Sequence, residues 1–157
     1  MPRYVDFTPD RKLQVADGSV SIATGQDAFL DTTVSGASTV FDVGSAATNL
    51  RVVLDVTSCT VNPDSIYYLH IYGSNDSTMA TGVALLGSIV LGHYSLIGTT
   101  TSRGIGRHTV TCTNVASNLP ASLSAQVLTP MRYVKAVIWA AGLGGTINFQ
   151  AWIASAK

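Results

Sequence analysis

The sequence predicts an all-β protein built as a two-sheet antiparallel sandwich. Apolar and polar residues alternate with a period of two over several runs that are rich in aromatic and β-branched residues, as is typical of half-buried strands. Clusters of Gly, Pro, Asn and Asp separate these runs at the spacing common in sandwiches and barrels. About eight to ten strands are expected, and no stretch indicates a long helix.

The clearest strands lie near the C-terminus, over residues 131–141 and 145–153. Alternate residues from Val134 to Ala140 in the first run, and from Ile147 to Ile153 in the second, form faces that are expected to be buried. Glycines at both ends of the intervening link supply the positive φ that a short reversal needs. The two runs are therefore predicted to pair as a hairpin.

Residues 49–59 are the best candidate for a central strand, with Leu50 and alternate residues up to Val56 on one face. A turn leads to a return strand over residues 66–74, which is expected to pair with it. Further strands are expected over residues 13–15, 20–22, 39–44, 85–91 and 107–115, with a short helical turn near Met79. The connections over residues 74–84, 98–106 and 116–130 are long for a simple meander. They favour strands that cross between two sheets, as in a jelly roll.

The chain is predicted to form one domain over residues 13–157, preceded by an extended N-terminal arm over residues 1–12. The arm contains two prolines and five of the eighteen charged residues. Exposed aromatic side chains need a surface to bury against, so Arg3, Tyr4 and Phe7 are the candidate partner-binding residues. A disordered tail is the alternative interpretation.

The composition points to a protein covered by partners. Charged residues make up only 11% of the chain, hydrophobic residues 46%, and the net charge is zero. Such a chain offers no basic field for nucleic acid or for an anionic membrane, and it has little electrostatic protection against self-association. The N-terminus lacks a secretory signal pattern and no run approaches a membrane span, so synthesis in the cytoplasm is expected. Cys59 and Cys112 are expected to be buried thiols rather than a disulfide.

No catalytic motif is evident, and the chain is predicted to be a non-enzyme without cofactor or metal. A Gly-x-Ser-x-Gly elbow and glutamate are both absent. His70 and His108 could approach each other if their strands were neighbours, but neither they nor His93 have metal-ligand spacing. A cupin-type metalloenzyme therefore remains a minor alternative.

A carbohydrate-binding β-sandwich module, in a phage tail or a secreted enzyme, is the main alternative function. Aromatic side chains that could form a stacking platform support it. They are Tyr67, Tyr68, Tyr72, Trp139 and Trp152. Several of them share a face with apolar residues such as Ile66 and Val137, so core or subunit packing also explains them.

The order of the segments resembles the jelly-roll cement (decoration) proteins of tailed-phage capsids. The resembling stretches are residues 40–44, 69–77, 131–135 and 145–151, which together span most of residues 27–154. The resemblance implies a non-enzymatic virion protein, made in the host cytoplasm, that binds the outer capsid surface. It also implies that the major capsid protein is a partner, that the protein bridges and stabilises capsid subunits, and that it forms a homodimer or homotrimer.

Overall fold

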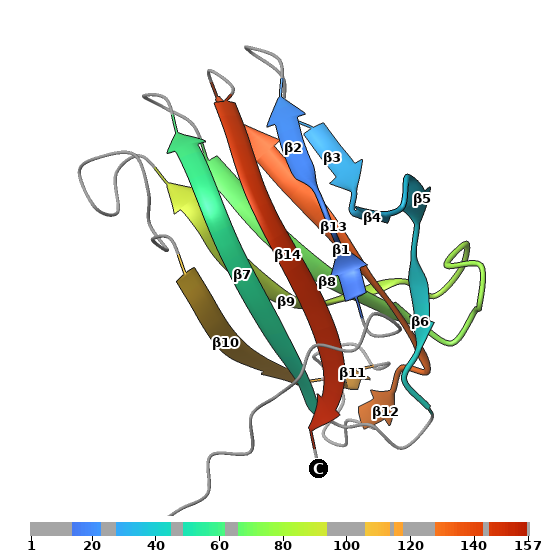
Figure 1. Ribbon diagram of the computed structural model, residues 1–157. Helices are drawn as coiled ribbons and strands as arrows, with labels where there is room; N and C mark the ends of the chain where they lie inside the picture. The colour runs from blue at the N-terminus through green and yellow to red at the C-terminus, as the bar shows by residue number, and fades with distance from the viewer. Residues whose placement is uncertain are drawn as a thin grey trace, which may run out of the picture.

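The computed structural model describes residues 14–22, 28–44, 49–61, 66–93, 106–113, 115–117, 128–142 and 145–156. Within these ranges all regular structure is β, which confirms the predicted fold class (Figure 1). The strands are β1 (Gln14–Ala16), β2 (Ser19–Ile22), β3 (Ala28–Asp31), β4 (Thr33–Val34), β5 (Ala37–Ser38), β6 (Val40–Asp42), β7 (Asn49–Val61), β8 (Ile66–Ser74), β9 (Ala84–His93), β10 (Gly106–Thr113), β11 (Val115–Ser117), β12 (Leu128–Pro130), β13 (Tyr133–Ala141) and β14 (Gly145–Ala156).

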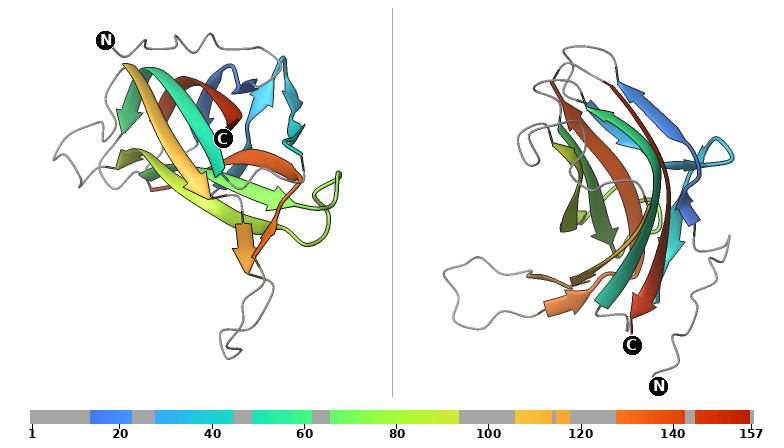
Figure 2. Two further views of the ribbon diagram at one scale, coloured as in Figure 1. Left: turned by 90° about the horizontal axis from the view of Figure 1, so that it is seen from below. Right: turned by 60° about the vertical axis from the view of Figure 1, so that its left-hand side comes forward.

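The larger strands form two antiparallel sheets that face each other. Sheet A has the order β1-β14-β7-β10, with β2 also on β14, and sheet B has the order β3-β13-β8-β9, with β6 also on β13. Figure 2 shows the two layers and their shared curvature from two further sides. Two short pairs, β4-β5 and β11-β12, lie outside this arrangement.

The connectivity is that of a jelly roll. β1 and β2 pair with successive parts of β14, and β3 and β6 pair with successive parts of β13, so each pair acts as one interrupted edge strand. Counted in this way, sheet A contains the first, eighth, third and sixth strands of the chain, and sheet B the second, seventh, fourth and fifth. Consecutive strands thus cross between sheets except for β8 and β9, which pair within sheet B. The long connection over residues 74–84 therefore does not cross between sheets, contrary to the prediction.

Two predicted strand pairings are wrong. β13 lies in sheet B and β14 in sheet A, so these two strands do not pair as a hairpin. β7 and β8 are likewise in different sheets. Alternation determines which face of a strand is buried. It does not determine whether the next strand pairs with it in the same sheet or packs against it from the opposite sheet, because both arrangements bury the same face. Gly142 has a φ of 98°, so the expected positive φ is present in a different kind of connection.

The predicted buried faces are confirmed, because the hydrophobic core lies between the two sheets. Leu50, Val52, Leu54 and Val56 of β7 pack with Ile147, Phe149, Ala151 and Ile153 of β14 from one side. Tyr67, Leu69 and Ile71 of β8 and Val134, Ala136, Ile138 and Ala140 of β13 close the core from the other. The side chains on the opposite face of each strand therefore point away from the core.

Some local structure was not predicted. The short hairpin β4-β5 turns at Ser35 and Gly36, both with positive φ, and interrupts the edge of sheet B between β3 and β6. The segment at Met79 is a turn and not a helix, and Met79 itself has a φ of 57°. The predicted arm, residues 1–12, lies outside the described residues.

Candidate functional site

The outer face of sheet B carries a group of aromatic and aliphatic side chains, called the aromatic face below. Strand register sets them in three rows that run across the sheet. The rows are Phe29, Trp139, Tyr68 and Val90; Asp31, Val137, His70 and Ser88; and Val40, Lys135, Tyr72 and Leu85. Because all five strands of sheet B contribute, the face depends on the topology of the sheet and not on any one segment.

His70 is the centre of the aromatic face. Its ring centroid lies 5.9 Å from that of Tyr68 and 6.0 Å from that of Tyr72, on which it stacks at an interplanar angle of 16°. The Phe29 and Trp139 rings lie 6.3 Å and 6.4 Å away, both edge-on. These are distances at which aromatic rings attract one another. The rings also line a shallow hollow of about 240 Å³, together with Ser88.

Large apolar side chains are exposed on this face. Among the described residues, Phe29 is 64% exposed, Leu85 51%, Val83 45% and Val40 36%. Three of these four belong to the aromatic face, and Val83 lies directly before β9. Exposed apolar side chains that gather on one face of a protein often mark a place where another molecule docks.

The imidazole of His70 is held neutral within the cluster. Both ring nitrogens are buried and neither has a hydrogen-bond partner among the described residues. Burial lowers the pKa of His70 from its ordinary value, because removal from water disfavours the charged form. At neutral pH the ring therefore behaves as an aromatic side chain with one donor and one acceptor.

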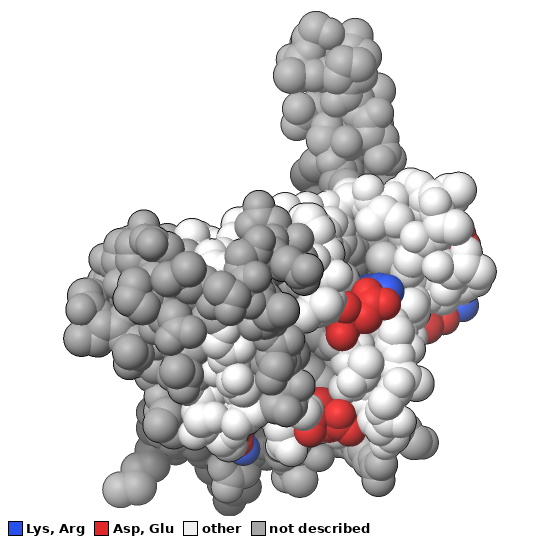
Figure 3. All heavy atoms as spheres, turned by 90° about the horizontal axis from the view of Figure 1, so that it is seen from above, with Lys and Arg blue, Asp and Glu red and all other residues white. Residues whose placement is uncertain are grey.

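Charges on the aromatic face neutralise one another. Lys135 Nζ lies 2.7 Å from Asp31 Oδ1, across neighbouring strands. Arg132, the residue directly before β13, donates to both carboxylate oxygens of Asp42, and these hydrogen bonds lower the pKa of Asp42. The Arg132 guanidinium also lies 5.3 Å from the ring centroid of Tyr133. Figure 3 shows how few charged side chains the described surface carries when it is viewed from above.

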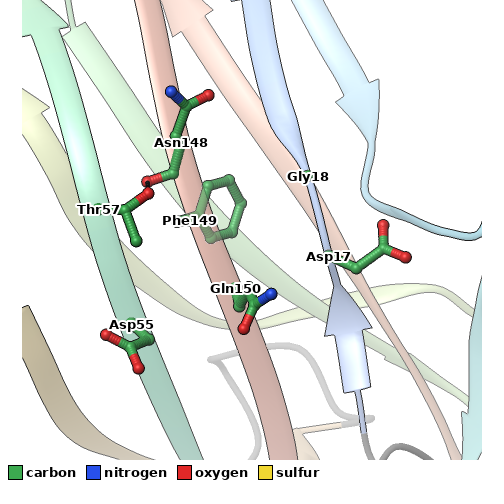
Figure 4. Close-up of a pocket in the computed structure, with 7 residues that line it drawn as sticks. All are labelled: Asp17, Gly18, Asp55, Thr57, Asn148, Phe149 and Gln150. Atoms are coloured by element: carbon green, nitrogen blue, oxygen red, sulfur yellow. Dashed lines mark hydrogen bonds between the residues drawn. The ribbon is translucent and has the colours of Figure 1, made fainter.

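A polar hollow of about 380 Å³ lies on the outside of sheet A and is the second candidate site (Figure 4). Asp17 and Asp55 line it from opposite sides of β14, with Gln150 between them. Each carboxylate already has a partner: Asp17 accepts from the Ser35 backbone N–H at 2.8 Å, and Asp55 pairs with Arg107 at 3.1 Å. The two carboxylates do not converge on a shared point, so the hollow has no evident acid–base chemistry.

A third hollow lies beside the loop after β8, and Asp76 organises that loop. Its carboxylate accepts hydrogen bonds from the backbone N–H and the hydroxyl of both Thr78 and Thr81, and from the backbone N–H of Ala80. The Ser74 hydroxyl donates to the Thr81 carbonyl at 2.6 Å and closes the loop. These polar groups of the loop form hydrogen bonds with one another, so we assign the loop a structural role and not a binding role.

The loop is expected to loosen in acid. Hydrogen bonds from Thr78 and Thr81 lower the pKa of Asp76 to about 2, below the ordinary 3.8. A carboxylate with a lowered pKa stabilises the fold above its ordinary pKa, and this contribution is lost as the pH falls toward about 2. Backbone amide exchange over residues 76–81 should therefore accelerate in Asp76→Ala at neutral pH. Equal protection in Asp76→Ala and the unsubstituted protein would contradict this role.

The structure brings together some of the predicted aromatic platform and separates the rest. Tyr68, Tyr72 and Trp139 meet on the aromatic face. Tyr67 is buried in the core, and Trp152 is buried on sheet A, so a platform of all five residues is ruled out. Phe29 was missed. The polar residue Asp31, two positions later on the same strand, indicates that Phe29 lies on the outer face of the sheet.

The condition under which His70 and His108 could approach each other is not met. His70 lies in sheet B and His108 in sheet A, because β8 and β10 are not neighbours. The described residues contain no group of three His, Cys, Asp or Glu that could hold a metal ion. His93 is placed at the end of β9, but its side chain lies outside the described ones. Arg3, Tyr4 and Phe7 also fall outside the described residues, so their predicted role stays a prediction.

Cys112 is a buried free thiol, as predicted, and burial raises its pKa. It lies opposite Leu50, whereas Cys59 is opposite Ile147. Cys59 lies nine positions after Leu50 on β7, which is about 30 Å at the rise of a strand. This separation is far too great for a disulfide within the chain.

Comparisons with known proteins assign no family to this chain. No protein-family model matches the chain, and no curated protein matches it. One similar solved structure is that of the infectious bursal disease virus Gx strain, at 12% identity and a TM-score of 0.37. The similarity covers 89% of this chain and only 29% of the viral chain. Among the described residues, no helix is long and apolar enough to cross a membrane.

Proposed function

We propose that this chain is a structural virion protein, a jelly-roll cement protein that binds the outer surface of a capsid and bridges major capsid protein subunits. The observation that carries the proposal is the aromatic face, where Phe29, Val40 and Leu85 leave apolar surface in water. Such surface is costly for an isolated protein and is used when another protein covers it. The low charge of the chain and the segment resemblance support the same function.

The mechanism is mass action rather than chemistry. A protein that binds only the assembled shell stabilises that state over free subunits. Many weak contacts repeated by the symmetry of the shell then add as avidity. The protein would be made in the host cytoplasm and reside on the virion surface, and residues 1–12 would contribute a strap to a neighbouring subunit.

The test uses purified capsid shells that lack the protein. Adding the full chain is expected to raise the temperature at which the shells release their contents. The double variant Phe29→Ser and Leu85→Ser should bind less and protect less, because it removes the apolar surface that docks. Shells that neither bind the unsubstituted protein nor gain heat resistance from it would refute the proposal.

Carbohydrate binding is the second candidate, and the hollow lined by Tyr68, Tyr72 and Trp139 favours it. Aromatic rings stack on the apolar faces of sugars. However, Tyr68 and Trp139 are inclined at 45° and do not form a flat platform. A glycan array separates the two functions: binding that Trp139→Ala abolishes would support this candidate, and a flat array would remove it.

A further inference from the structure

We infer that the chain directly before β1, residues 7–13, crosses the outer face of sheet A in the free protein and covers Trp152 and Val53. These seven residues lie outside the described ones, so their place follows from the surface that they would cover. In the proposed function the N-terminal arm provides a strap for a neighbouring subunit. Here part of the same segment has a binding surface on its own chain.

Trp152 and Val53 point away from the core. The residues on either side of each, along β14 and along β7, belong to the core cluster between the sheets. Successive side chains of a strand point to opposite faces, so Trp152 and Val53 lie on the outside of sheet A. Register sets Gln14, Trp152 and Val53 side by side on β1, β14 and β7, and this set is called the buried row below. Figure 1 views sheet A from this outer side.

The buried row is shielded from water. Trp152 is 5% exposed, Val53 3% and Gln14 9%. The described strands that pack on β7 and β14 are their neighbours within sheet A and, for β7, β9 of sheet B on the inner side. None of these strands lies over the outer face. An indole on a sheet face with nothing over it keeps much of its large surface in water. A further segment of the chain therefore covers the row.

The cover is narrow. Gln150, two positions before Trp152 on β14, and Arg51, two positions before Val53 on β7, are both exposed. They lie on opposite sides of the buried row, each about 7 Å from it along the strands. Thr109, opposite Val53 on β10, is exposed as well. The cover is thus about as wide as one extended segment, and it runs across β14 and β7 from the edge formed by β1.

The chain before β1 begins at the end of this row. Gln14 is the first residue of β1 and lies opposite Trp152. Two strand spacings of about 4.8 Å separate β1 from β7, and an extended chain advances about 3.3 Å per residue, so roughly four residues reach Val53. Phe7 and Leu13 are the two largest apolar side chains of residues 7–13. We therefore expect Phe7 to bury its ring against the buried row.

Tryptophan fluorescence of the full chain tests the inference. Trp139→Phe leaves Trp152 as the single tryptophan, and acrylamide then reports how far that indole is open to water. This parent variant should be quenched weakly, and adding Phe7→Ser should raise the quenching constant about threefold, because the covering segment loses its apolar contact. Val83→Ser is the matched control, since Val83 is an exposed aliphatic residue next to β9 of sheet B, and it should leave quenching unchanged. Thermal unfolding of each variant checks that the fold is intact.

Trypsin gives a second measurement, because the segment contains Arg11 and Lys12. Cleavage after these two residues should be about tenfold slower in the parent variant than in Phe7→Ser. Equal quenching of Trp152 in the parent and in Phe7→Ser, or an equal rise in Val83→Ser, would overturn the inference. Equal cleavage rates in the parent and in Phe7→Ser would also overturn it, since the segment would then not be held on the sheet. Both measurements use the free chain, so capsid shells that ignore the protein would refute the proposed function and leave this inference standing.

Discussion

Replacing Phe149 with alanine is expected to lower the free energy of unfolding by about 3–5 kcal/mol, the largest effect of any substitution considered. Phe149 is almost fully buried in the core, on β14, the strand of sheet A that pairs with β1, β2 and β7. Truncation removes a large apolar side chain and leaves a cavity that the surrounding strands cannot close. Chemical denaturation followed by tryptophan fluorescence measures the change.

The matched control for Phe149→Ala is Gln150→Ala. Gln150 is the next residue on the same strand and is exposed on the outside of sheet A. Its substitution should change stability by less than about 0.5 kcal/mol. A loss at Gln150 that equals the loss at Phe149 would mean that the faces of β14 are assigned the wrong way round.

The second large effect is expected for Gly73→Ala. A Cβ atom at Gly73 would lie 2.6 Å from Leu86 Cδ1 and 2.8 Å from Met131 Cβ, closer than real carbon atoms approach. Met131 Cβ is fixed by the backbone next to β13, so the strands themselves must shift. Overpacking of this kind costs about 1–3 kcal/mol.

Gly18→Ala serves as the control, because nothing lies within 4 Å of a Cβ atom there. Its expected effect on stability is within about 0.5 kcal/mol of zero. Thermal unfolding of both variants compares them directly. If Gly73→Ala unfolded at the same temperature as Gly18→Ala, the close approach of β8 to Met131 would be refuted.

Much of the fold followed from the sequence because burial imposes a period of two on a strand. Leu50 to Val56 and Ile147 to Ile153 were assigned to the core by alternation alone, and both faces are buried. Alternation could not show that β13 and β14 lie in opposite sheets. The same residues of the two strands are buried whether the strands pair as a hairpin or face each other across the core. Only contacts between distant segments, such as β13 with β3 and β6, decide between them.

The candidate site was predicted less well than the core, for a related reason. Tyr68, Tyr72 and Trp139 were recognised as aromatic residues with an available face, but the grouping depended on which strands are neighbours. Trp152 looked equivalent to Trp139 in sequence, yet it lies in the other sheet. Phe29 sits in a strand of four residues, too short for alternation to stand out.

Hydroxyl-radical footprinting of the assembled particle tests most directly whether other proteins cover the aromatic face. Phe29, Tyr68 and Trp139 are expected to be modified more slowly in the particle than in the dilute isolated chain. Met79, a partly exposed residue in the loop after β8, reports the general effect of assembly. Protection of the aromatic face beyond that of Met79 is the expected result. Equal modification of Phe29 and Trp139 in the particle and in the free chain would mean that no other protein covers the aromatic face.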